Sequence, residues 1–297
     1  MIIVDYSGIA IAAIFSQQRP DEIEEGLIRH MILNSLRMYN VKFKQDYGQM
    51  IIACDSTSWR KEKYPQYKFK RKSARDESPL DWTKFFTILN GIRDEIAEEM
   101  PYPVVHVDRA EADDVIATLV ESTQEFGQNE PVMIVSSDKD FIQLHRYSNV
   151  KQYSPMKRSL IKEDNPAFYK FDHICRGDTS DGVPNILSPD DTFENGLRQT
   201  PMYKKKIQAW YEAYPNLCDE GVMTQDQYRN YCRTSVDQLW HDHNIGHQTH
   251  SPNPHSPQLT FQFSANLAHA EPQSQKESFV WVWRVALALY RMRAKAI

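Results

Sequence analysis

The chain begins with short, continuous apolar runs that alternate with stretches of helical periodicity. The apolar runs predict strands at 2–4, 50–54, 103–107 and 132–135. Apolar residues at helical spacing predict helices at about 21–38 and 111–126. Strands that are apolar throughout, with helices between them, indicate a mostly parallel central sheet covered by helices, so the expected fold class is α/β.

The pattern changes twice further along the chain. From about Phe168 it turns helical, with interruptions at Gly177–Asp178 and Gly182–Pro184. After about residue 240 it becomes rich in proline, serine, glutamine and histidine. Six of the ten histidines fall in 241–269. We therefore expect an α/β core at 1–165, an α-helical second subdomain at 166–240 and an atypical tail at 241–297. For the tail we favour disorder or adventitious metal binding over a built metal site.

Composition narrows the class of protein. With 41% hydrophobic and 25% charged residues, the 297-residue chain has a globular composition. No apolar run approaches the roughly 18 residues of a membrane helix, and the start of the chain resembles no signal peptide. Four cysteines without CxxC spacing argue against a disulfide framework or a zinc ribbon. We expect a cytoplasmic protein that is neither secreted nor membrane-bound.

Acidic residues gather at or just beyond the carboxyl ends of the predicted strands, with one further pair in the helical region. They form five groups: Asp5; Asp55; Glu111, Asp113 and Asp114; Asp138 and Asp140; Asp178 and Asp181. One such acid is often just a helix cap, but ligands bind where parallel strands end, so several acids there indicate a site. Like charges brought together need a cation, and carboxylates suit magnesium or manganese. The sequence therefore predicts a site for more than one hard cation, which can hydrolyse phosphodiesters.

Basic residues gather elsewhere, directly after the second predicted strand. The segment Trp59–Arg75 holds eight basic residues, one acid and four aromatics. Such a charge run is usually a solvated loop. Aromatics interleaved with cations also suit single-stranded nucleic acid, because bases stack on rings while lysine and arginine follow the phosphates. The position next to Asp55 favours the second interpretation, although the net charge of the chain is −5.

Together these motifs resemble the flap endonuclease and 5′–3′ exonuclease family, and within it the T-even phage branch. The matching segments are Ile3–Asp5, Asp55 with Trp59–Arg60, Tyr67–Lys68 with Arg71, Glu111–Asp114, Ser137–Phe141 and Gly177–Asp181. Their order and spacing agree over about residues 1–235. The resemblance implies a PIN-like 5′ nuclease core, with a DNA-binding function for the helical subdomain.

The resemblance also implies a role for each matching residue. A first Mg²⁺ would be surrounded by Asp5, Asp55, Glu111, Asp113, Asp114 and Asp138. A second Mg²⁺ would be held or oriented by Asp140, Asp178 and Asp181, and Mn²⁺ would substitute for either ion. The catalytic residues would be Asp5, Asp55, Arg60 and Lys68. An arch or bridge at about 57–80 would grip the 5′ strand through Arg60, Tyr67, Lys68, Arg71 and Lys72. Lys204 and Lys205 would either contact the duplex or form a solvated face.

The activity that the resemblance implies is that of a magnesium-dependent 5′–3′ exonuclease and flap endonuclease with RNase H-type activity. Its substrates would be DNA with 5′ flaps or forks, and RNA–DNA hybrids. Family members remove 5′ flaps and RNA primers during DNA replication, beside a polymerase or a single-strand DNA-binding protein. For a phage-encoded member the place of action would be the host cytoplasm.

Two departures from the family pattern leave alternatives open. Residues 181–189 lack the later glycines of the family's phosphate-binding hairpin, and the chain beyond about Arg233 does not align. One alternative is a PIN-type single-strand ribonuclease, which the basic segment and the Asp178–Asp181 pair disfavour. The other is a non-catalytic DNA-binding relative, which the presence of every family acid disfavours.

Overall fold

The computed structural model describes residues 1–15, 23–125 and 129–213, all of which belong to one compact unit, Met1–Gln238. The predicted tail at 241–297 and the last part of the predicted helical subdomain lie outside the described residues. None of the described helices is both long enough and apolar enough to cross a membrane.

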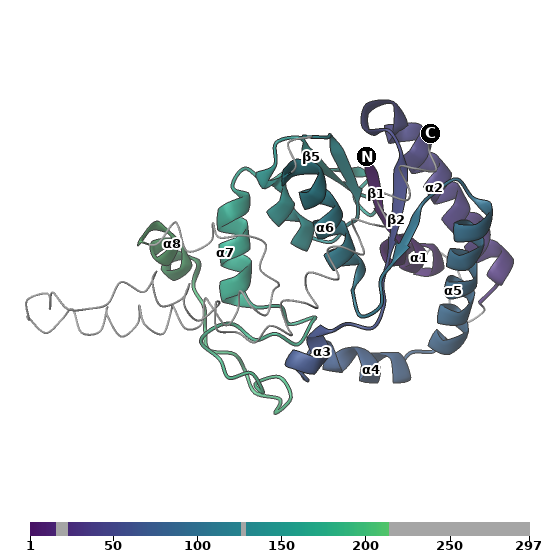
Figure 1. Ribbon diagram of the computed structural model, residues 1–297. Helices are drawn as coiled ribbons and strands as arrows, with labels where there is room; N and C mark the ends of the chain where they lie inside the picture. The colour runs from purple at the N-terminus through teal and green to yellow at the C-terminus, as the bar shows by residue number, and fades with distance from the viewer. Residues whose placement is uncertain (16–22, 126–128, 214–297) are drawn as a thin grey trace, which may run out of the picture. The chain divides into compact units, whose positions relative to one another are not determined.

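A six-stranded sheet in the order β3-β2-β1-β4-β5-β6 forms the centre of this unit (Figure 1). Its strands are β1 (Ile2–Asp5), β2 (Met50–Cys54), β3 (Val104–His106), β4 (Val132–Val135), β5 (Val150–Ser154) and β6 (Ser159–Ile161). Every neighbouring pair is parallel except β5 and β6. The predicted α/β class with a mostly parallel sheet is therefore confirmed.

The helices match the predictions in part. They are α1 (Tyr6–Phe15), α2 (Glu25–Tyr47), α3 (Arg60–Lys63), α4 (Phe69–Asp76), α5 (Trp82–Glu99), α6 (Ala112–Glu125), α7 (Pro166–Arg176) and α8 (Lys204–Ala213), with a 3₁₀ helix, η1 (Asp140–Arg146). The predicted helix at 21–38 is wrong at its end, because α2 continues to Tyr47. Tyr39 and Phe43 extend its buried face, and Gly48, at φ 79°, ends the helix in the conformation that favours glycine.

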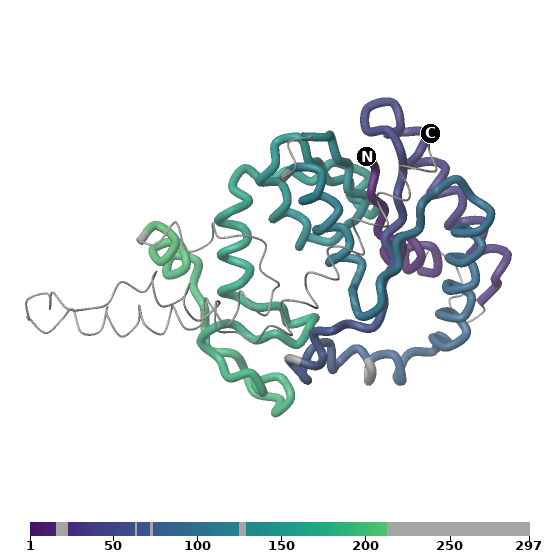
Figure 2. Tube along the Cα trace, viewed as in Figure 1, coloured from purple at the N-terminus to yellow at the C-terminus, as the bar shows by residue number. Residues whose placement is uncertain are grey.

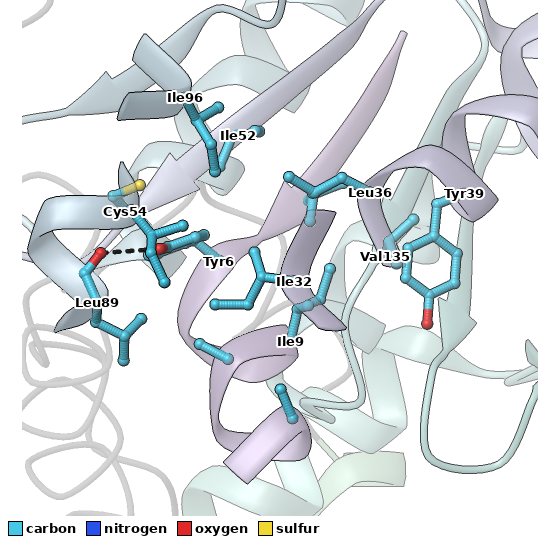
Figure 3. Packing of buried hydrophobic residues seen from close by; sticks show 14 of the residues in the cluster. Tyr6, Ile9, Ile32, Leu36, Tyr39, Ile52, Cys54, Leu89, Ile96 and Val135 are labelled. Atoms are coloured by element: carbon cyan, nitrogen blue, oxygen red, sulfur yellow. Dashed lines mark hydrogen bonds between the residues drawn. The ribbon is translucent and has the colours of Figure 1, made fainter. Parts of the chain in front are cut away.

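The main core lies between the sheet and three helices, α1, α2 and α5, which cover one face in Figure 1. Ile2 and Val4 of β1 belong to this core, whereas Ile3, between them, points to the opposite face, where α6 packs. Figure 3 shows the packing at close range, with the buried Tyr6 hydroxyl donating a hydrogen bond to the Leu89 carbonyl at 2.8 Å. Both faces are thus covered, which explains why the strands are apolar throughout.

A smaller core joins α7 to α8. Phe171 and Cys175 of α7 pack with Ile186 and with Ile207 and Trp210 of α8. Between these helices the described chain forms turns rather than the helices that its pattern predicts. A helical subdomain at 166–240 stays a prediction, because its remainder lies outside the described residues.

Candidate active site

The strand register brings the acidic ends of the parallel strands to one edge of the sheet. Asp5 pairs with Ala53 of β2, and Val4 pairs with Val135 of β4. The direction of the strand order reverses between β1 and β4, and such a switch point forms a crevice at the carboxyl ends of the strands. The acids that follow β1, β2 and β4 therefore meet there, as the sequence predicts.

Asp5 is the acid at the centre of this edge. Its Oδ1 accepts a hydrogen bond from the Gly8 backbone N–H at 3.0 Å, and its Oδ2 accepts one from the Ser136 hydroxyl at 2.9 Å. Burial, with repulsion from Asp55 and Asp138, nevertheless raises the pKa of Asp5 to about 6. The carboxylate is thus held in place, and no lysine or arginine among the described residues pairs with it.

The start of α6 adds a second group of acids. Asp55 Oδ1 accepts a hydrogen bond from the Ala112 backbone N–H at 2.8 Å, which ties the end of β2 to the start of α6. In the next position, burial and repulsion from Asp138 and Asp5 raise the pKa of Asp113 well above its usual range. Within the described part of the chain, no lysine or arginine pairs with Asp113.

Asp138 and Asp140 follow β4 in a tight turn. The Asp140 backbone N–H donates to Asp138 Oδ1 at 2.9 Å. The Asp138 side chain reaches solvent at the rim, yet desolvation by its surroundings and repulsion from Asp140 raise its pKa. Asp140 Oδ1 lies 3.1 Å from His173 Nε2, a contact with α7 that the sequence motifs do not reveal.

The remaining acid pair follows α7. Asp178 Oδ1 accepts hydrogen bonds from the backbone N–H and hydroxyl of Ser180, at 2.7 and 2.6 Å. Asp181 is 8% exposed and pairs with Arg71 at 2.5 Å, with Lys68 Nζ 3.7 Å away. The structure therefore supplies this pair with partners from its own turn and from the basic segment.

Arg60, Tyr67 and Lys68 converge on Glu111 and Asp114. Arg60, only 7% exposed, donates to Glu111 at 2.9 Å and makes a two-point contact with Asp114 at 2.9 and 2.8 Å. The Tyr67 hydroxyl and Lys68 Nζ donate to Glu111 at 2.8 and 2.6 Å. Burial opposes the charge of Glu111, but Lys68 and Arg60 outweigh it and hold the pKa below its usual range. Basic residues therefore neutralise both acids, and Arg60 has no open surface through which to grip a strand.

The basic segment also packs against the turn that carries Asp181. The Lys68 backbone N–H donates to the Asp181 carbonyl at 2.7 Å, and the Tyr64 hydroxyl lies 3.0 Å from the Gly182 and Asp190 carbonyl oxygens. Figure 2 shows the path, from β2 along α3 and α4 to α5. The predicted arch thus lies beside the turn that holds Asp178 and Asp181. Arg71 and Asp181, which are in contact there, are 110 residues apart in the sequence.

The other predicted nucleic-acid contacts differ in placement. Arg71 is on α4 and remains partly exposed beside Asp181, whereas the Lys72 side chain lies outside the described part of the structure. Lys204 and Lys205 are exposed in the first turn of α8 and line a hollow with Gln208 and Glu212. Within the described residues, none of their contacts reaches the acids at the sheet edge.

The donor set favours a hard divalent cation. The acids at the edge offer carboxylate oxygens. The raised pKa values of Asp5, Asp113 and Asp138 reflect first their burial and then a mutual repulsion, and a cation would offset both. In the part of the chain that the structure describes, no three His, Cys, Asp or Glu side chains already surround a single ion position. Mg²⁺ keeps several waters and usually takes one or two carboxylates, so separated carboxylates fit it better than a closed cage would.

Sequence reasoning missed three residues of this site. Gly8 and Ser136 hold Asp5, and His173 contacts Asp140. A glycine three residues after Asp5 and a serine two residues before Asp138 are local signals that could have pointed to the first two. No local signal links His173 to Asp140, because helix packing alone brings them together.

A mostly parallel sheet with acids along its carboxyl edge, and a basic segment beside them, defines the class of resolvase-like nuclease domains. Residues 1–171 match the family model of the 5′–3′ exonuclease N-terminal resolvase-like domain. The chain is also 33% identical over 241 residues to the Ribonuclease H of Enterobacteria phage T4, and the aligned segment covers 77% of each protein. The chain belongs to the 5′–3′ exonuclease and flap endonuclease family, whose members are hydrolytic nucleases.

Solved structures agree with the fold. The T5 D15 protein, co-crystallised with metal ions, superposes with a TM-score of 0.57 at 16% identity, over 80% of this chain and 86% of that one. A bacteriophage T5 D15 flap endonuclease variant, in a pseudo-enzyme–product complex with DNA and metal ions, gives a TM-score of 0.54 at 16% identity, over 80% and 85%. At this identity the likeness shows the fold alone.

Proposed function

We propose that the chain is a magnesium-dependent, structure-specific 5′ nuclease that hydrolyses phosphodiesters in DNA and RNA–DNA hybrids. The observation that carries the proposal is the group Asp5, Asp113 and Asp138 at the carboxyl edge of the sheet, whose charges repel one another and form no ion pair within the described residues. When bound there, two divalent ions would activate a water and stabilise the leaving oxygen. Mn²⁺ would substitute for Mg²⁺, because both prefer oxygen ligands.

The contacts divide the nine predicted acids by role. We assign direct binding of the first ion to Asp5, Asp113 and Asp138, whose charges repel one another. Asp55 follows β2 and would bind the first ion from there, while it accepts a hydrogen bond from the Ala112 backbone N–H at the start of α6. Glu111 and Asp114, neutralised by basic residues, would act indirectly by holding Arg60 and Lys68 beside the ions. Asp140, Asp178 and Asp181 would hold or orient the second ion.

The basic segment supports the proposed substrate class. Lys68 and Arg71 both lie beside Asp181, so a phosphate that approaches the second acid pair would meet both cations. A 5′ flap or a fork offers a single strand next to a duplex, which fits a cationic segment beside the acids. Primer and flap removal in phage-type replication would place a polymerase and a single-strand DNA-binding protein among the partners.

The decisive experiment compares products from 5′-end-labelled substrates with Mg²⁺ and with EDTA. We expect Mg²⁺-dependent cutting near the base of a 5′ flap and in an RNA-primed duplex, with a matched 3′-flap duplex left intact. Preferred cutting of plain single-stranded RNA would instead identify a PIN-type ribonuclease. Salt-sensitive DNA binding without cleavage would identify a non-catalytic relative.

A change at Gly8 tests whether the position of Asp5 matters. A Cβ at Gly8 would lie 2.8 Å from Asp5 Oδ2 and 3.2 Å from its Cγ, so Gly8→Ala must displace the carboxylate. We expect flap cleavage to fall about tenfold or more, as when a group that orients a metal ligand is lost. Steady-state kinetics on the flap substrate measures the loss.

Gly91→Ala is the matched control, because Gly91 is also helical and has no atom within 4 Å of the added Cβ. This variant is expected to keep full activity and to gain about 0.5–1 kcal/mol of stability. Equal activity of the two variants would contradict the assigned role of Asp5.

A further inference from the structure

Helix α7 brings a histidine to Asp140, one of the acids assigned to the second ion. His173 Nε2 lies 3.1 Å from Asp140 Oδ1, and both side chains are partly buried, at 29% and 27% exposure. His173 also faces the charges of Asp178 and Asp138. None of the roles assigned above uses this side chain.

The surroundings of His173 hold its ring in one orientation. Tyr169, one turn earlier on α7, stacks against it with ring planes 13° apart and centroids at 6.0 Å. The helix is anchored by Phe171 and Cys175, both almost fully buried, so its position relative to η1 is determined by packing. The imidazole therefore approaches Asp140 from a rigid element.

The contact is made with one carboxylate oxygen only. Among the described residues, His173 Nε2 makes no aligned hydrogen bond, so the 3.1 Å approach is a charge contact with Asp140 Oδ1, and Asp140 Oδ2 has no protein partner there. His173 is also close in sequence to Asp178, because α7 ends at Arg176 and is capped by Gly177, whose N–H donates to the His173 carbonyl at 2.9 Å. One helical turn thus touches Asp140 through a side chain and leads directly into Asp178.

We propose that His173 is a positioning residue that orients Asp140 and thereby sets the affinity of the second divalent ion. The inference rests on the proposed two-metal function. Groups that orient a metal-binding ligand typically change metal affinity by about 10–100-fold when removed. A purely structural ion pair would change the stability of α7 and leave metal affinity unaltered.

The test is a titration of the full chain with Mn²⁺, in which electron paramagnetic resonance measures the free ion. His173→Ala is expected to weaken the weaker of two sites by about 10–100-fold and to leave the tighter site unchanged. His173→Gln should recover most of the affinity, because its amide can donate to Asp140. His30→Ala, on the exposed face of α2, is the matched control and should bind both ions like the wild type.

Kinetics provides an independent measurement. The Mg²⁺ concentration for half-maximal cleavage should rise for His173→Ala while KM for DNA stays constant. Wild-type affinity at both sites in His173→Ala, with helix content preserved by circular dichroism, would overturn the inference alone. A wild-type chain that binds no Mn²⁺ and cuts no flap would instead refute the proposed function on which the inference rests.

Discussion

Replacement of Asp113 by asparagine is expected to lower kcat for flap cleavage by about a thousandfold. Asp113 lies in the first turn of α6, where the charges of Asp138, Asp5, Asp55 and Asp140 all act on it. Asparagine keeps the size of the side chain but cannot neutralise a cation. Loss of several kcal/mol of transition-state charge stabilisation, of which about 4 kcal/mol corresponds to a thousandfold, gives this magnitude. Single-turnover cleavage at saturating enzyme isolates the chemical step.

The same substitution should stabilise the metal-free protein. The pKa of Asp113 is raised in the folded state. The carboxylate therefore lowers the free energy of unfolding, and it does so increasingly as the pH rises above the pKa that Asp113 has in the unfolded chain. At pH 8 in EDTA, Asp113→Asn is therefore expected to melt at a higher temperature than the wild type. Mg²⁺ should then raise the melting temperature of the wild type and have little effect on the variant.

Asp46→Asn is the matched control, since Asp46 is exposed on α2. It should alter neither the turnover nor the response to Mg²⁺. Unchanged turnover in Asp113→Asn would show that the metal assignment is wrong. A lower melting temperature in EDTA would show that burial and repulsion do not make the Asp113 carboxylate destabilising.

The parts of the fold that could be predicted are those that local pattern determines. Strands β1, β2 and β4 lie within a residue of their predicted bounds, because strands covered on both faces must be apolar throughout. Convergence of Asp5 and Asp138 followed from one further rule, that parallel strands present their carboxyl ends at the same edge. Helix α1 was not predicted, because its apolar residues show no helical period.

Pairings between distant charges could not be predicted. Arg60 is 51 residues from Glu111, and nothing in either segment indicates that the arginine is buried against that acid. The basic segment therefore looks like a free cationic loop in the sequence, although part of it anchors acids. His173 poses the same problem, since its contact depends on how α7 packs against η1.

The turns after α7 could be predicted only as interruptions of a helical pattern, for a steric reason. Gly177 adopts φ 67°, and a Cβ there would lie 2.4 Å from the carbonyl oxygens of Val183 and Pro184. The chain folds back closely at this point, which Asp178 and Val183 stabilise as an isolated bridge. The glycines at 177 and 182 mark interruptions in the sequence, but periodicity does not report such close backbone approach, so the extent of the turns was not predicted.

Lys68 combines features that set it apart from the other basic residues. Its Nζ lies 2.6 Å from the Glu111 carboxylate and 3.7 Å from the Asp181 carboxylate, and so bridges the start of α6 and the turn after α7. Its backbone has φ 56°, the left-handed region that non-glycine residues rarely adopt, so the surrounding structure must hold it there. A side chain held in this way can exchange a carboxylate for the phosphate of a bound strand, and its charge would then stabilise the phosphate during cleavage.

Lys68→Met is accordingly expected to reduce kcat by about a hundredfold, the effect of losing one preorganised charge, while the Kd for flapped DNA changes far less. Lys44→Met, at an exposed lysine on α2, serves as the control.

A second variant separates two explanations for a loss of activity. If Lys68 only neutralises Glu111, then Lys68→Met combined with Glu111→Gln should regain activity. If Lys68 acts on the phosphate, as we expect, the combined variant stays slow, whereas equal losses in kcat and binding would reduce Lys68 to a simple phosphate contact.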